Sequence, residues 1–76
     1  MQTMGDRLER TRKRRVMSQE ELATAAGVPV GTISRIENGH TEAPRPSTTR
    51  KLAAALGVEP AWLVFGEESM PEKRAA

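Results

Sequence analysis

Apolar residues recur at helical spacing in two short stretches on either side of a glycine. Leu22 and two nearby alanines fall on one helical face, and Gly27 follows where the chain must turn. Beyond it, Ile33 and the isoleucine three positions later share a face. The pattern predicts a helix over about 19–26, a tight turn and a second helix over about 29–38. This is the spacing of a helix-turn-helix.

The helix over about 19–26 has a clear start, because Ser18 and Glu21 have the spacing of a capping box. In the helix over about 29–38, the face opposite the isoleucines carries small or polar residues: Gly31, Ser34, Arg35 and Asn38, with Val30 and Thr32 on its flanks. Apolar periodicity alone also fits a plain helical hairpin in a small bundle. The tight turn combined with this outer face favours a helix that reads DNA.

Three more helices are expected. The first covers about residues 4–15, with Leu8 facing inward and Val16 and Met17 closing it. Two prolines make residues 40–46 an extended loop. The remaining two helices start at Pro46 or Ser47 and at Pro60, and stop at Gly57 and Gly66. We therefore expect one domain over residues 1–66 and a frayed tail over 67–76.

The composition limits the class of protein. The chain has 76 residues, no cysteine, and 3% aromatic residues, so its core must be aliphatic. No apolar run has the length of a membrane span or signal peptide, which suggests a cytoplasmic location. With one histidine and no phosphate-cradling glycine loop, nothing indicates an enzyme, a cofactor or a metal.

The charge is small but unevenly placed. Net charge is +2, yet six of the twelve Lys and Arg residues lie between positions 7 and 15. Such clustering fits a surface that meets a polyanion. Alone this is weak support, because basic runs are commonly solvated helix faces and also resemble nuclear localisation signals or membrane-binding patches. The apolar aromatic face that membrane binding needs is missing here.

Three motifs together carry a resemblance: SQEELA at 18–23, GVPVGTISRIENG at 27–39 and LAAALGVEPAWLVFG at 52–66. Over about residues 8–66 the chain resembles the lambda-repressor-like DNA-binding domains (Cro/C1 type, XRE family) of bacteria and their phages. The resemblance implies an all-α, five-helix fold whose third helix enters the major groove of double-stranded DNA. It also implies a homodimeric, sequence-specific transcriptional regulator, most simply a repressor.

The resemblance also implies roles for individual residues. Positions matching base-reading residues are Gln19, Val30, Gly31, Thr32 and Arg35. Contacts with the DNA backbone are expected from Asn38, His40 and Arg45, and we add Ser18 at a helix start and Arg14 and Arg15 from the basic cluster. Arg12 and Glu37 match a structural ion pair between the first and third helices. Val58, Leu63 and Val64 are candidates for a dimer interface.

Some of these assignments have alternatives. Pro29 stands where Ser or Thr often caps the third helix, and Gly31 has no side chain with which to read a base. Arg35 fits either the two acceptors of guanine or a phosphate. Val30 fits a thymine methyl group or packing onto the preceding helix, and His40 fits a solvated loop residue.

A competing class is a protein-binding module, such as an antitoxin that neutralises a toxin and represses its own operon; a restriction-modification controller is a further variant. Antitoxins usually need a further segment for the toxin, and only ten residues follow Gly66. A regulator without a separate effector domain is therefore preferred.

Overall fold

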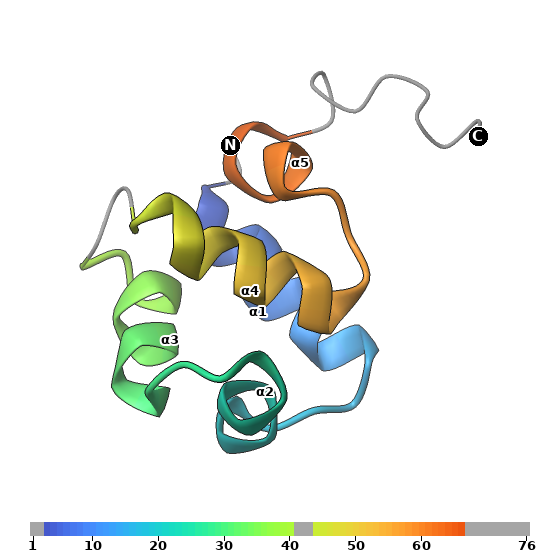
Figure 1. Ribbon diagram of the computed structural model, residues 1–76, viewed down its shortest axis with the longest axis vertical. Coiled ribbons are helices and arrows are strands. Elements are labelled where there is room, and N and C mark those ends of the chain that lie inside the picture. Colours follow the sequence, from blue (N-terminus) through green and yellow to red (C-terminus); the bar gives the residue numbers. More distant parts are fainter. Residues whose placement is uncertain (1–2, 41–43, 67–76) are drawn as a thin grey trace.

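The computed structural model describes residues 3–40 and 44–66, which fold into five α-helices (Figure 1). These are α1 (Met4–Arg14), α2 (Gln19–Ala26), α3 (Val30–Glu37), α4 (Pro46–Leu56) and α5 (Pro60–Phe65). Neither described range contains a strand. The predicted all-α, five-helix fold is confirmed. The predicted tail over 67–76 and positions 41–43 of the predicted loop lie outside the described residues.

The first two helices each begin with a capping box. At α2, the hydroxyl of Ser18 accepts from the amide of Glu21 (3.0 Å), and the amide of Ser18 donates to the Glu21 carboxylate (2.8 Å), as predicted. Thr3 and Asp6 make the same reciprocal bonds at α1. The box at α1 was not predicted, although Thr3 and Asp6 have the same three-residue spacing of a hydroxyl and a carboxylate.

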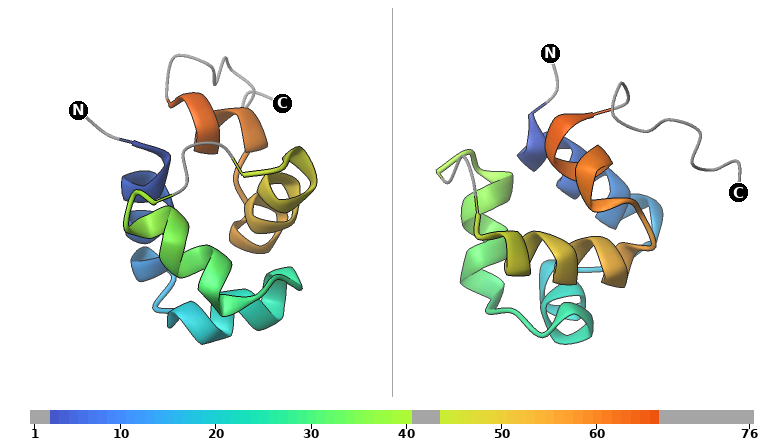
Figure 2. Two further views of the ribbon diagram at one scale, coloured as in Figure 1. Left: turned by 90° about the vertical axis from the view of Figure 1, so that its left-hand side faces the viewer. Right: turned by 45° about the horizontal axis from the view of Figure 1, so that its top comes forward.

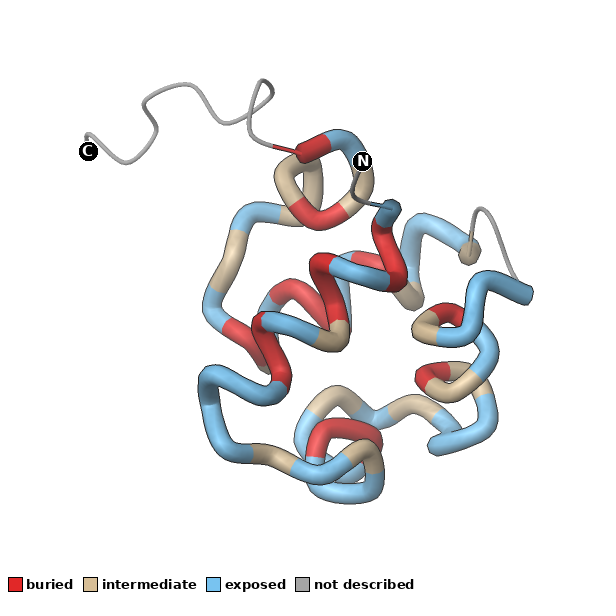
Figure 3. Tube along the Cα trace, turned by 180° about the vertical axis from the view of Figure 1, so that it is seen from behind, coloured by how far each residue is buried: buried red, intermediate tan, exposed pale blue. Residues whose placement is uncertain are grey.

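The helices surround one aliphatic core. α3 packs against α1 and α2, α4 against α2 and α5, and α5 also against α1 (Figures 1 and 2). Buried residues lie on the inward sides of the helices (Figure 3). The largest fully buried side chains are all leucine or isoleucine: Leu8, Leu22, Ile33, Ile36, Leu52, Leu56 and Leu63. Burial of such side chains contributes about 1.5 to 3 kcal/mol each.

α1 approaches the end of α3 through a buried glycine. A Cβ atom placed on Gly5 would lie against the carbonyl oxygen of Ile36 and 3.2 Å from the Cα atom of Glu37. Only a residue without a side chain allows this approach. The close crossing brings the polar side of α1 within reach of the Glu37 side chain.

Val16 and Met17 follow the end of α1, as predicted, but Val16 does not pack against the core. Its side chain is 87% exposed, and its φ of +56° lies in the left-handed region. The amide of Val16 donates to the carbonyl of Lys13, and the amide of Met17 donates to that of Arg12, which is the Schellman pattern of a helix end. Val16 thus occupies the position that normally holds glycine. Met17 packs against the core instead.

Candidate nucleic-acid interface

The turn between α2 and α3 is as tight as the sequence predicted. Gly27 has a φ of +74°, and its amide and that of Val28 both donate to the carbonyl of Ala23. α3 then starts after Pro29, which makes no side-chain capping hydrogen bond. The start of α3 therefore lacks the side-chain acceptor that a Ser or Thr would supply, as the sequence indicated.

α3 presents the expected face to solvent. Figure 2 (left) looks onto this helix, which stands at the surface of the molecule. Gly31, Arg35 and Asn38 are exposed and Val30 is 41% exposed, whereas Ile33 and Ile36 are buried. Thr32 and Ser34 are half-buried on the flanks. A Cβ atom on Gly31 would meet nothing within 4 Å, so packing does not explain this glycine.

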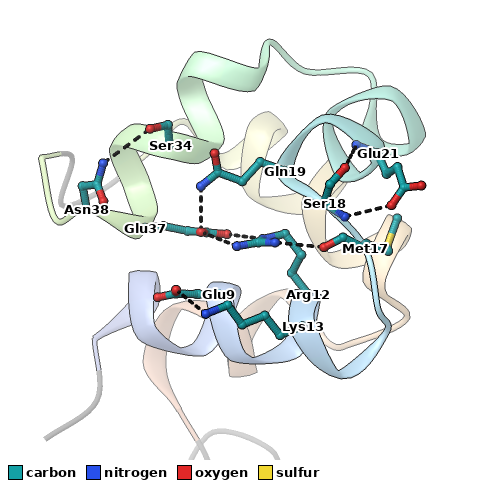
Figure 4. A network of polar contacts seen from close by, with 10 residues as sticks. All are labelled: Glu9, Arg12, Lys13, Met17, Ser18, Gln19, Glu21, Ser34, Glu37 and Asn38. Carbon is teal, nitrogen blue, oxygen red and sulfur yellow. Dashed lines mark hydrogen bonds and ion pairs between the residues drawn. The ribbon is translucent and has the colours of Figure 1, made fainter.

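Glu37, the last residue of α3, is the centre of a polar network (Figure 4). The Arg12 guanidinium donates to both of its carboxylate oxygens, from Nε (2.8 Å) and Nη2 (2.9 Å). The two side chains are only 10% and 4% exposed. The hydrogen bond to Glu37 raises the pKa of Arg12 above its ordinary value, despite the opposing effect of burial. The pair implied by the family resemblance is present and bidentate.

The same network joins the start of α2. Nη1 of Arg12 donates to the carbonyl oxygen of Met17 (2.8 Å), and Nε2 of Gln19 donates to Oε1 of Glu37 (2.9 Å). A carboxylate can only accept, so the amide nitrogen of Gln19 must face Glu37. Three segments are thereby held in one orientation: the end of α1, the start of α2 and the end of α3.

These bonds change how two predicted contacts are understood. The side-chain amide of Gln19 already donates one hydrogen bond to Glu37, and both the hydroxyl and the backbone amide of Ser18 take part in the capping box. The first turn of α2 also carries Glu20 and Glu21, which oppose an anion at this helix start. Gln19 and Ser18 thus have structural roles whether or not they contact DNA.

The basic cluster of α1 is less available to a polyanion than its sequence suggested. Arg7 and Arg12 are 7% and 8% exposed, and both donate to other parts of the chain. Lys13 pairs with Glu9 at 3.0 Å on the surface. Arg14 is exposed. Two of the six clustered cations are therefore structural.

The Arg15 side chain lies at the C-terminal end of α4, away from α3 (Figure 1). Its guanidinium is 3.4 Å from where a Cβ atom on Gly57 would lie, at the C-terminal end of α4. Figures 1 and 2 show that this end is remote from α3. Cations stabilise the C-terminal end of a helix, which gives Arg15 a local role.

The remaining backbone candidates lie near the ends of α3 and α4. His40 is exposed, and its amide donates to the carbonyl of Arg35 (2.8 Å) as part of the cap of α3. Arg45 is exposed and is the N-cap residue of α4, which has no side-chain capping bond. Asn38 makes a long contact with Ser34 (3.4 Å).

One predicted dimer contact is wrong. Leu63 is fully buried within its own chain, so its side chain belongs to the core. Val58 and Val64 are half-buried. Phe65, which is not among the predicted contact residues, is 69% exposed at the end of α5.

The described residues show neither a membrane span nor a metal centre. Within 3–40 and 44–66, no helix has the length and apolar character needed to cross a bilayer. The same ranges hold no group of three or more His, Asp or Glu residues placed to bind a metal ion.

Comparison with known proteins gives the family. The family model described as Helix-turn-helix matches residues 8–63. The HTH-type transcriptional repressor RghR of Bacillus subtilis (strain 168) is 43% identical over 58 residues, covering 76% of this chain and 43% of RghR. The HTH-type transcriptional regulator PrtR of Pseudomonas aeruginosa is 44% identical over 73 residues, covering 92% of this chain and 26% of PrtR. The chain thus spans less than half the length of these relatives.

A solved structure supports the same assignment. The P22 c2 repressor in complex with the synthetic operator 9T superposes with a TM-score of 0.82 at 33% identity, covering 88% of this chain and 100% of that one. These relatives are DNA-binding transcriptional regulators and not enzymes. Together with the turn and the outward face of α3, the matches show that the chain belongs to the lambda-repressor-like, Cro/C1-type family of helix-turn-helix DNA-binding domains.

Proposed function

We propose that this protein is a sequence-specific transcriptional repressor that inserts α3 into the major groove of DNA and binds its operator as a homodimer. The observation that carries the proposal is the exposed face of α3, which consists of small and polar residues. The opposite face of the same helix is fixed to the rest of the protein. Ile33 and Ile36 anchor it in the core, and Glu37 ties its end to α1 and α2. A recognition helix held in this way keeps its side chains in register with base edges.

Arg35 is assigned to base reading. It is exposed on the outer face of α3, and a guanidinium can bond both O6 and N7 of guanine. Val30 and Thr32 are placed to contact thymine methyl groups or base edges beside it. Gly31, with open space around it, permits close approach of the helix backbone. Gln19 contributes at the edge of the site, through the part of its amide that Glu37 does not use.

Contacts with the DNA backbone are assigned to residues that flank this face. Arg45 and Arg14 supply charge, Asn38 and His40 lie where α3 ends, and Ser18 and Arg15 are the weaker candidates, given their intramolecular contacts. Such contacts position a protein on the duplex without reading sequence. A repressor of this kind acts where the DNA is, which in a bacterium is the cytoplasm.

The test begins by selecting bound sites from a random duplex pool. Arg35→Ala is then compared with Arg45→Ala on the selected site and on random duplex. Loss of a base contact should weaken binding to the selected site by about 1 to 3 kcal/mol and leave random binding nearly unchanged. Loss of a phosphate contact should weaken both and reduce the salt slope by about one.

Two outcomes would count against the proposal. If the pool yields no preferred site, the protein does not read sequence. If Arg35→Ala weakens selected and random duplex equally with a shallower salt slope, Arg35 binds phosphate, and specificity comes from Val30, Thr32 or DNA shape. Arg35 lies opposite the buried isoleucines, so its truncation leaves the core intact.

A further inference from the structure

An open hollow lies between the start of α4 and α5. Its volume is about 390 Å³, which is within the range of small-molecule sites. Most of its wall is apolar and includes Pro44, Pro46, Pro60, Val64 and Phe65. No residue of α3 lines it, so the hollow is separate from the face proposed to read DNA.

The wall of the hollow also contains a buried hydroxyl group. Thr49 lines the hollow from the start of α4 and is only 5% exposed. Its backbone amide donates to the carbonyl of Arg45 (3.0 Å), but its hydroxyl has no hydrogen-bonding partner within the described residues. Buried polar groups are normally hydrogen-bonded, because an unsatisfied one costs free energy. Valine has the same shape and would line the hollow without that cost, so the hydroxyl is a bonding group for a molecule that enters.

The surroundings of this hydroxyl favour a negative charge. Arg50 follows Thr49 and is the only charged residue among the described residues that line the hollow. Pro46, also in the lining, is the first residue of α4, whose first turn carries neither a side-chain cap nor an acidic residue. The positive end of the helix dipole is therefore not neutralised there. Together with the Thr49 hydroxyl, these charges select an acceptor that is an anion.

The two parts of the lining define the chemistry of a ligand. A wall of proline rings and Phe65 packs well against a flat hydrocarbon ring. A carboxylate at one end of that ring can accept from both the Thr49 hydroxyl and the Arg50 guanidinium. Because the hydroxyl is 95% buried, a group that bonds to it has to enter the hollow. This favours a small molecule over the flat surface of another protein.

We propose that this hollow binds a small aromatic carboxylic acid, with its ring against Pro60 and Phe65 and its carboxylate bonded to Thr49 and Arg50. The proposal goes beyond the repressor function proposed above and does not rest on it, because it is tested without DNA. Val64 lines the hollow and is also a candidate dimer contact, so a second copy of the chain is the alternative occupant.

The experiment titrates the isotope-labelled protein with 2-naphthoate and follows its backbone amides by NMR. The probe 2-naphthamide has the same shape without the charge and is the control ligand. We expect saturable shifts at Thr49, Arg50 and Ala61, and weaker binding of the amide than of the carboxylate.

Three variants test the contacts. Thr49→Val should weaken binding of naphthoate about tenfold, because a hydrogen bond to a charged group is lost, and should raise the melting temperature, because a buried unpaired hydroxyl is removed. Arg50→Gln should weaken it about threefold, as expected for an exposed charge. Lys51→Gln removes the same charge from an exposed neighbour outside the lining, and should bind naphthoate as the unaltered protein does. Thr49→Ser, which keeps the hydroxyl, should retain binding and tests the same contact if Thr49→Val does not fold.

Four outcomes would overturn the proposal. The first is that naphthoate does not produce saturable shifts in the hollow. The second is equal affinity of Thr49→Val and the unaltered protein, which would show that the hydroxyl does not bond to the carboxylate. The third is an equal loss in Arg50→Gln and Lys51→Gln, which would show attraction by general charge. The fourth is that the amides of the hollow shift on dilution of the protein without probe, which would show that a second copy fills the hollow and would leave the proposed homodimer standing.

Discussion

Arg12 and Lys13 are neighbours on α1, yet their ion pairs differ in burial. The Arg12–Glu37 side chains are 10% and 4% exposed, whereas those of Lys13 and Glu9 are 65% and 40% exposed. Removing one partner of a buried pair leaves an uncompensated charge, at a cost on the order of 3 kcal/mol. An exposed pair is worth under about 1 kcal/mol.

We therefore expect Arg12→Ala to lower the free energy of unfolding by about 3 kcal/mol and Lys13→Ala to change it by less than about 1 kcal/mol. Urea denaturation followed by circular dichroism measures both. Equal, small losses in the two variants would show that the Arg12–Glu37 pair is exposed in solution. A large loss in Arg12→Ala also predicts weaker DNA binding, because α3 loses its tether to α1.

Val16 is the second residue whose replacement gives a sharp test. It occupies the glycine position of a Schellman motif with a φ of +56°, and its side chain is 87% exposed. A side chain in this region costs about 1 to 2 kcal/mol, and branching at Cβ makes it worse. Val16→Gly should raise stability by about 1 kcal/mol, after the larger entropy loss of glycine on folding is counted.

Val16→Ala serves as the matched control, because it removes the branch but keeps Cβ. Its gain in the urea midpoint should be smaller than that of Val16→Gly. A loss of stability in Val16→Gly would mean that the valine makes contacts in solution that outweigh the strain.

Single residues were predictable from the sequence only where their partners are local. The Ser18 and Glu21 box spans three positions and was read directly. The Arg12–Glu37 pair, 25 positions apart, was inferred only through family resemblance. Arg7 bonds to a carbonyl 56 positions away, and an arginine bound to backbone looks the same in sequence as a solvated one. The sequence alone therefore does not show which arginines of the basic cluster are structural.

At the scale of helices, two glycines form a matched pair. Gly5 is the second residue of α1 and Gly31 the second residue of α3. A Cβ atom on Gly5 would lie against the carbonyl oxygen of Ile36, which is backbone and cannot rotate away; one on Gly31 would meet nothing within 4 Å. Replacement by alanine must therefore have opposite effects on stability at the two positions.

Gly5→Ala should destabilise the fold by about 1 to 3 kcal/mol, because α1 has to move away from the end of α3. Gly31→Ala should stabilise it by up to about 1 kcal/mol through helix propensity. The melting temperatures of the two variants show whether stability falls in Gly5→Ala and rises in Gly31→Ala. A melting temperature unchanged by Gly5→Ala would show that the two helices pack less closely than described. Gly31→Ala also reports function: if the backbone of α3 approaches DNA closely at Gly31, operator affinity falls although stability rises.

The helices themselves were the most predictable part of the molecule, because their starts and stops use local chemistry. Gly27, Gly57 and Gly66 end three helices where the sequence placed those ends. The assignment of Leu63 to a dimer contact failed because α5 is too short to show a helical period. Its inner and outer faces are decided by contacts with α1 and α4, which no local pattern records.

At the scale of the whole molecule, charge alone does not account for DNA binding. The chain carries a net charge of only +2, and two of its clustered arginines are buried. Each phosphate contact contributes about 0.9 to the slope of log affinity against log salt. With so small a net charge, one subunit should bind DNA weakly, and the homodimer proposed above should bind more tightly because it doubles the number of phosphate contacts.

Two copies related by a two-fold axis make the spacing of their half-sites a geometric requirement. In the proposed homodimer each α3 reads one major groove, and successive grooves on one side of the duplex are one turn apart, roughly 34 Å or about 10 base pairs. Inserting about 5 base pairs between the half-sites moves the second to the opposite side of the helix, beyond reach of the second subunit. Affinity should then fall to that of a single half-site in a gel-shift titration. Equal binding of the unaltered protein to both spacings would show that each subunit binds alone.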